Sequence, residues 1–187
     1  FSRGAPLLLV QYFSSNFTFF LCFSWLLPYL KSQYHLTSAE AGVYASIPLY
    51  LGAFANWISG AAVDALYRRG YYRASRAAPA IFGFALATVA LLAAASAPSV
   101  GFATFYFGLA TLGVDLTLSP SWTACMDIAG KHTGTLTGAM NMLGNIGSFV
   151  SSVSFPYLLK LTTTPKIYFY LAALLNVAGL LCWCYVR

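Results

Sequence analysis

One acidic residue, Asp115, lies in the middle of a long apolar stretch, GLATLGVDLTLSPSW, in a chain with only four acidic residues. An ionised side chain at the centre of a lipid bilayer costs several kcal/mol, so a residue of this kind usually faces a cavity or a partner. Asp115 is therefore a candidate proton-coupling residue. The alternative is a structural role, in which a protonated Asp115 forms a hydrogen bond with a neighbouring helix.

The neighbours of Asp115 form a stripe of polar and small residues. Helical spacing puts the following on one face: Gly108, Thr111, Asp115, Ser119 and Trp122. Pro120 lacks a backbone N–H and predicts a kink in the same helix. A polar stripe beside a kink is typical of a cavity wall in a helix bundle. Close packing through small residues would explain Gly108, but it would not explain the acid.

A second stripe follows in the segment GTLTGAMNMLGNIGSFVSS. Its members, at helical spacing, are Gly134, Gly138, Asn141, Asn145, Ser148 and Ser152. The glycines predict close helix approach. Asn141 and Asn145 both need hydrogen-bond partners in an apolar environment, which could be substrate oxygens or neighbouring helices. Asn145 lies deeper in the segment and is the better candidate for substrate binding, with Asn141 second.

Polar residues also gather in the first apolar segment. Gln11, Ser15, Thr18 and Cys22 share a helical face. That face is too polar for contact with lipid, so we expect it to point into the bundle.

The composition defines the environment of these stripes. Of the 187 residues, 59% are hydrophobic and 7% are charged, against about 25% charged in soluble domains. A surface in water cannot be built from so few charges, which predicts an all-α, polytopic membrane protein. The formal net charge is +6, but the cations lie between apolar runs, and this pattern does not indicate a nucleic-acid partner.

Six segments are long and apolar enough to cross a membrane, each having about 20 suitable residues. They cover approximately residues 5–30, 39–63, 77–95, 100–125, 133–159 and 167–186. Short polar connections separate them. Six crossings would put both ends of the segment on one side of the membrane.

The cations are distributed unequally between the two sides. One side would carry seven, namely Arg3, Arg68, Arg69, Arg73, Arg76, Lys131 and Arg187, and the other three, namely Lys31, Lys160 and Lys166. The positive-inside rule then puts both ends in the cytoplasm. We expect a plasma membrane or a bacterial inner membrane.

Enzymatic and metal-binding roles find no support in the sequence. The four cysteines form no CxxC pair and suit small apolar packing positions, so no metal site or cofactor is expected. An intramembrane serine protease would need a GxSG motif, which does not occur, and a histidine within a span, whereas His35 and His132 lie in predicted loops. A membrane module that only binds a ligand stays as an alternative.

The loop after the second segment reads GAAVDALYRRG, from Gly60 to Gly70. It resembles the signature loop of the major facilitator superfamily, Gly-x-x-x-Asp-(Arg/Lys)-x-Gly-(Arg/Lys)-(Arg/Lys). The matching residues are Gly60, Asp64, Arg68 and Arg69, whereas Ala65 and Tyr67 depart from the pattern. The resemblance implies a gating contact at the cytoplasmic face, and the alternative is that the arginines only determine topology. For Arg73 and Arg76 we favour the topological role.

Within that superfamily the chain is most similar to the anion:cation symporter family. The resemblance is carried by FLCFSWLLPYL (20–30), LSPSWTACMD (118–127) and GAMNMLGNIG (138–147). It implies that the chain is a C-terminal six-helix half whose N-terminal half is absent, with an organic anion as substrate and a proton or sodium ion as the coupling cation. It also implies which residues line the substrate site: Gln11, Asn16, Ser119, Ser121, Trp122 and Asn145. A drug/proton antiporter of the same superfamily is the alternative.

Overall fold

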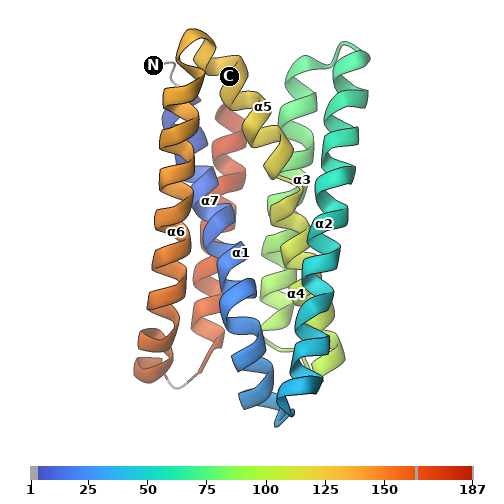
Figure 1. The fold of residues 1–187 in the computed structure, drawn as a ribbon, viewed down its shortest axis with the longest axis vertical. Coiled ribbons are helices and arrows are strands. Elements are labelled where there is room, and N and C mark those ends of the chain that lie inside the picture. Colours follow the sequence, from blue (N-terminus) through green and yellow to red (C-terminus); the bar gives the residue numbers. More distant parts are fainter. Residues whose placement is uncertain (1–3, 163, 187) are drawn as a thin grey trace.

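The computed structural model describes residues 4–162 and 164–186, and these residues contain helices and no β-strand. The α-helices are α1 (Gly4–Tyr34), α2 (Ser38–Arg68), α3 (Tyr72–Ala94), α4 (Val100–Asp115), α5 (Leu118–Ala129), α6 (Thr133–Thr162) and α7 (Lys166–Tyr185). A short 3₁₀ helix, η1 (Gly130–His132), joins α5 to α6. The described chain begins and ends at the same end of the bundle (Figure 1).

The helices extend beyond most of the predicted segments, because hydropathy marks only their apolar parts. Thr37 caps the start of α2: its hydroxyl accepts from the Glu40 amide while the Glu40 carboxylate accepts from the Thr37 amide. Helix α2 continues through Arg68, and the chain then turns at Gly70, whose φ of 84° suits glycine. The predicted loop from residue 64 is therefore helical over its first five residues.

The predicted segment 100–125 is not one continuous helix. It is divided into α4 and α5 at Leu116 and Thr117, and α5 runs on to Ala129. Pro120 explains why the break falls here, since proline cannot donate to the carbonyl four residues before it, that of Leu116.

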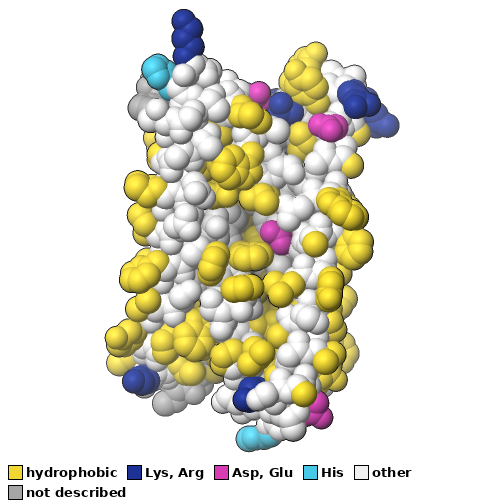
Figure 2. Space-filling model, in the orientation of Figure 1, with side chains coloured by type: hydrophobic (Ala, Val, Ile, Leu, Met, Phe, Trp, Pro, Cys, Tyr) yellow, Lys and Arg dark blue, Asp and Glu magenta, His cyan; other side chains and the backbone are white. Residues whose placement is uncertain are grey.

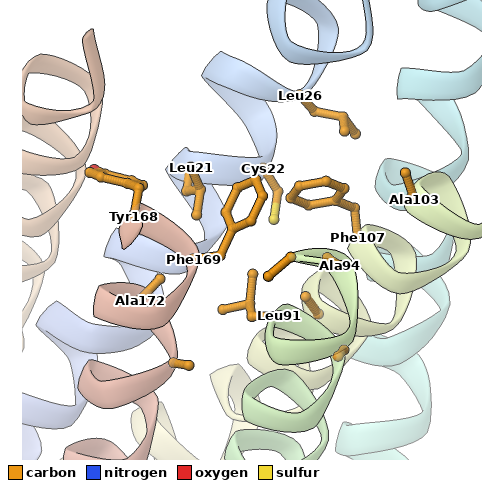
Figure 3. Packing of buried hydrophobic residues seen from close by; sticks show 14 of the residues in the cluster. Leu21, Cys22, Leu26, Leu91, Ala94, Ala103, Phe107, Tyr168, Phe169 and Ala172 are labelled. Carbon is orange, nitrogen blue, oxygen red and sulfur yellow. The ribbon is translucent and has the colours of Figure 1, made fainter. Parts of the chain in front are cut away.

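The helices α1, α2 and α6 stand side by side across one face, with α3 and α7 behind them (Figure 1). Contacts link α1 to α6 and α7, α2 to α4, and α3 to α4 and α7. A buried core fills the space between α1, α3, α4 and α7, where Phe107 and Phe169 meet edge to face with ring centroids 5.3 Å apart (Figure 3).

Glycines allow the closest helix crossings. A Cβ atom at Gly113 of α4 would lie 2.5 Å from the Gly83 carbonyl oxygen of α3. On α6, Cβ atoms at Gly144 and Gly147 would meet α1. Gly134 and Gly138 are not close-approach positions within the described residues, because both have open space where a Cβ atom would stand.

Four helical segments of the described chain are long and apolar enough to cross a membrane: Gly4–Tyr34, Tyr72–Ala94, Val100–Thr162 and Lys166–Tyr185. The third covers α4, α5 and α6 together. Helix α2 is not among them, although it has 31 residues and exposes large apolar side chains such as Phe54 and Trp57. Polar residues within α2, including Asn56 and Ser59, lower its hydropathy.

Candidate functional site

The break between α4 and α5 is stabilised from α2. The Ser59 hydroxyl is fully buried and donates to the Leu116 carbonyl at 2.6 Å, which replaces the bond that Pro120 cannot make. This contact joins α2 to the break directly after Asp115, the last residue of α4. The stripe predicted from Gly108 to Trp122 therefore crosses the break and does not follow one straight helix.

Asp115 lies beside a hollow of about 190 Å³, lined from α1 by Ser15, Asn16 and Phe19. The carboxylate is partly exposed, and an acidic side chain is visible halfway along this face of the molecule (Figure 2). Asn56 of α2 stands near the carboxylate, and its Nδ2 atom donates to the Gly52 carbonyl at 3.2 Å. Gly52 leaves room for the carboxylate, because a Cβ atom there would collide with it.

Asn16 joins this hollow to α6. Its Nδ2 atom donates to the Tyr12 carbonyl at 2.8 Å, and the side chain lies against Gly144. The Tyr12 ring in turn meets Trp122 of α5 edge to face, with centroids 6.0 Å apart. Asn16, Tyr12 and Trp122 thus form one contiguous group on α1 and α5, of which Asn16 lines the hollow beside Asp115.

Gln11 and Ser121 lie elsewhere, inside the bundle. Both side chains are fully buried, and Gln11 Nε2 donates to the Ser121 hydroxyl at 3.0 Å. Gln11 Oε1 accepts from Trp183 Nε1 of α7 at 3.2 Å. We call these three residues the polar knot. The predicted inward face of α1 is confirmed, since Gln11, Ser15, Thr18 and Cys22 are all buried.

The two asparagines of α6 are exposed, so they face out of this bundle. Asn145 Nδ2 donates to the Asn141 carbonyl at 2.9 Å within the helix. Ser119 of α5 is partly exposed, and its hydroxyl lies 3.8 Å from where a Cβ atom of Gly60 would stand. The structure thus brings Asn16 to the hollow beside Asp115, and Trp122 to Tyr12. Ser119 lies towards α2, and the α6 asparagines form a separate exposed strip.

A second hollow, of about 220 Å³, lies between α1, α2 and α4 and shares Phe19 with the first. Cys22, Ser46 and Thr111 are its polar lining residues.

Asn56 and Ser59 of α2 are two residues near the break that the sequence analysis did not predict. Their signal was available, since each is polar within the apolar part of α2.

The signature-like loop is exposed at the end of α2. Asp64, Arg68 and Arg69 are all exposed, and no ion pair joins them within residues 4–162 and 164–186. The ion pair at this end joins Arg76 of α3 to Asp127 of α5, with Nε and Oδ2 2.9 Å apart.

The assignment of Arg76 to topology alone is wrong. Besides its ion pair, the Arg76 guanidinium lies over the Tyr67 ring, 4.8 Å from the ring centroid. Arg76 therefore ties α2, α3 and α5 together. In the described part of the chain, no group of three or more His, Cys, Asp or Glu side chains could hold a metal ion.

Comparisons with known proteins agree with this architecture. The family model of the Major Facilitator Superfamily matches residues 1–152. A probable sulfoacetate transporter of Cupriavidus necator is 28% identical over 170 residues, which is 90% of this chain and 40% of that protein. A probable chloroplastic anion transporter of Oryza sativa subsp. japonica is 26% identical over 164 residues, covering 83% of this chain and 31% of that protein.

A probable galactarate/D-glucarate transporter of Escherichia coli K12 is 28% identical over 160 residues, covering 81% of this chain and 34% of that protein. The chain thus spans less than half the length of these curated relatives. Because the family model covers most of the chain, this apolar helical bundle belongs to the major facilitator superfamily.

Proposed function

We propose that the chain is the C-terminal half of a secondary active transporter and crosses the membrane six times. The crossings are α1, α2, α3, α4 with α5, α6 and α7. Helix α4 has only 16 residues, and together with α5 it reaches the length that a span requires. The N-terminal half lies outside this chain and would cover the face that carries Asp115 and Asn16.

The proposed cargo is an organic anion, a sugar acid or another carboxylate. The observation that carries this proposal is that relatives from bacteria and a plant are named as transporters of sulfoacetate, galactarate/D-glucarate and anions. On the chain itself, amide and hydroxyl donors suited to an anion stand at Asn16, Ser119, Asn141 and Asn145. Trp122 would pack against the cargo. Gln11 and Ser121, which bond each other, would position α5.

Asp115 is the proposed site for the coupling cation, a proton or a sodium ion. Asp115 is partly exposed at a hollow, and no cationic side chain pairs with it in residues 4–162 and 164–186. A carboxylate next to an anion-binding site repels the cargo until a cation neutralises it. Binding of the two would therefore be coupled, as symport requires.

The loop residues Gly60, Asp64, Arg68 and Arg69 are proposed to gate the cytoplasmic face. Asp64, Arg68 and Arg69 are exposed here, so their proposed partners belong to the other half. Both ends of the chain would be cytoplasmic in a cell membrane. Arg3 and Arg187, which contribute to that assignment, lie outside the described residues.

Uptake into proteoliposomes tests the proposal. The full-length protein containing this chain would be reconstituted, and accumulation of radiolabelled D-glucarate and sulfoacetate measured with and without an inward proton or sodium gradient. Gradient-dependent accumulation of either acid is the expected result. Gradient-dependent export of a cationic drug instead would favour the antiporter, in which Asp115 binds the drug. Binding without any transport would favour the binding module.

A further inference from the structure

A groove lies at the start of α3, and none of its lining residues borders the hollow beside Asp115. It begins as a hollow of about 420 Å³ between α3, α5 and α7, with Ala77, Ile128, Trp183 and Val186 among its walls. Most of its lining is apolar, and its charged lining residues are Arg73, Arg76 and Asp127, which together carry a net positive charge. This combination of an apolar interior and a net positive charge is unusual in a chain with so few charges.

The groove continues along the outer surface of α3. A second hollow, of about 720 Å³, shares Tyr72, Arg73 and Ala77 with the first and extends to Ala78 and Ile81. The alanines leave a shallow channel that leads from the end of the helix towards its apolar middle. Tyr71 and Tyr72 are exposed at its entrance, where membrane proteins place aromatic side chains at the lipid headgroup level.

Arg73 and Arg76 differ in what their guanidinium groups can still bind. Arg76 is held by Asp127 at 2.9 Å, so the two charges offset each other. Arg73 is exposed, and its Nη2 atom makes a long hydrogen bond to the Cys184 carbonyl, at 3.4 Å. A guanidinium with donors to spare, at the mouth of an apolar channel, complements an anionic headgroup attached to an acyl chain.

We propose that this groove binds an anionic phospholipid of the surrounding leaflet. The phosphate pairs with Arg73, and an acyl chain follows Ala77, Ala78 and Ile81 along α3. The bound lipid would contact α3, α5 and α7 at once and hold their ends together. This site is distinct from the proposed transport site, since none of its lining residues lines the hollow beside Asp115.

Quenching of Trp183 by brominated lipid tests the proposal. The full-length protein would be placed in symmetric bilayers, and the emission of Trp183 taken as the difference between the wild type and Trp183→Phe. Dibrominated phosphatidylglycerol should quench this emission more than dibrominated phosphatidylcholine. Arg73→Gln should lower that preference about fivefold, as expected for loss of one cation at a lipid surface. Arg69→Gln, which removes an arginine outside the groove, should change it little at physiological salt.

Three results would overturn the proposal. Equal quenching by the two lipids would show that the groove has no preference for an anionic headgroup. No quenching by either lipid would indicate that protein covers the groove. Quenching relieved by millimolar inorganic phosphate would indicate a soluble anion as the ligand. If Trp183→Phe fails to fold, native mass spectrometry of Arg73→Gln and Arg69→Gln serves instead: only Arg73→Gln should retain less phosphatidylglycerol, and equal retention would contradict the site.

Discussion

Two polar regions contact α1 and differ in how their hydrogen-bonding groups are used. In the polar knot, Gln11 is fully buried and bonded to Ser121 and Trp183. In the hollow, Asp115 and Asn16 are partly exposed, and Asp115 has no cation beside it among the described residues. A polar group whose bonds are all made within the chain stabilises the bundle. A partly exposed group with unused capacity is available to a ligand.

The largest functional effect that distinguishes the hollow from the polar knot should come from Asp115→Asn. Removing the charge takes away the proposed cation site, so accumulation of the anion against its gradient should fall to the equilibrium level. Exchange of anion for anion should continue, because it needs no net movement of the cation. The measurement is gradient-driven uptake beside counterflow in the same proteoliposomes.

The control for Asp115→Asn is a measurement of its stability. Since a partly buried carboxylate costs solvation energy, its neutral replacement should leave the unfolding temperature in detergent unchanged or raised. Intact gradient-driven accumulation in this variant would contradict the coupling role, and a large loss of stability would assign Asp115 to the structural side of the comparison.

The second test uses two glycines of α6, one packed against α1 and one with open space beside it. A Cβ atom at Gly147 would lie 2.6 Å from the Phe13 carbonyl oxygen, and backbone cannot move aside as a side chain can. Gly147→Ala should therefore push α6 from α1 and lower stability by about 2 kcal/mol. Gly138 has open space, so Gly138→Ala should be neutral or stabilising by up to about 1 kcal/mol. Thermal unfolding of both variants decides; equal effects would contradict the close crossing.

The sequence allowed much of this architecture to be predicted. Helix spacing located the buried face of α1 correctly, because its polar side chains are bonded inside the bundle at Gln11 and Thr18. Pro120 predicted a distortion of this helix. The break falls at Leu116 and Thr117, because the carbonyl that Pro120 leaves without a donor is that of Leu116.

Other features could not be obtained from the sequence. Gln11 and Asn16 are both polar and close in sequence, yet one enters the knot and the other the hollow, which depends on where α5 and α7 lie. Gly134 and Gly144 look alike within one helix, and only the position of α1 distinguishes them. The Arg76–Asp127 pair joins residues 51 positions apart, and a loop-by-loop count of charges cannot reveal such a partner.

The third test removes the centre of the polar knot. Gln11→Leu keeps the volume but leaves the Trp183 indole N–H without its acceptor, while Ser121 still donates to the Thr117 carbonyl at 2.6 Å. One orphaned buried donor should cost about 2 kcal/mol of stability. Asn141→Leu is the control, since Asn141 is exposed and the change should alter stability little while affecting substrate affinity. If Gln11→Leu unfolds at the wild-type temperature and instead weakens substrate binding, Gln11 belongs with the ligand site.

The smallest effect on stability is expected at the break between α4 and α5. Ser59→Ala removes the hydroxyl that donates to the Leu116 carbonyl, so that carbonyl loses its replacement for the bond missing at Pro120. The cost should be about 1 kcal/mol, because interhelical hydrogen bonds in membranes are individually modest. Ser46→Ala is the matched control, as the Ser46 hydroxyl donates only to Val43 within its own turn of α2.

The Ser59 contact orients α5 relative to α4, and the knot and the hollow meet across that break. Ser59→Ala should therefore slow gradient-driven uptake more than its small effect on stability would suggest, whereas Ser46→Ala should change neither quantity. Equal uptake rates for the two variants would mean that the hydrogen bond only satisfies a carbonyl. A selective loss in Ser59→Ala would mean that the direction of α5, and with it the distance between Trp122 and Asp115, is what the transport step requires.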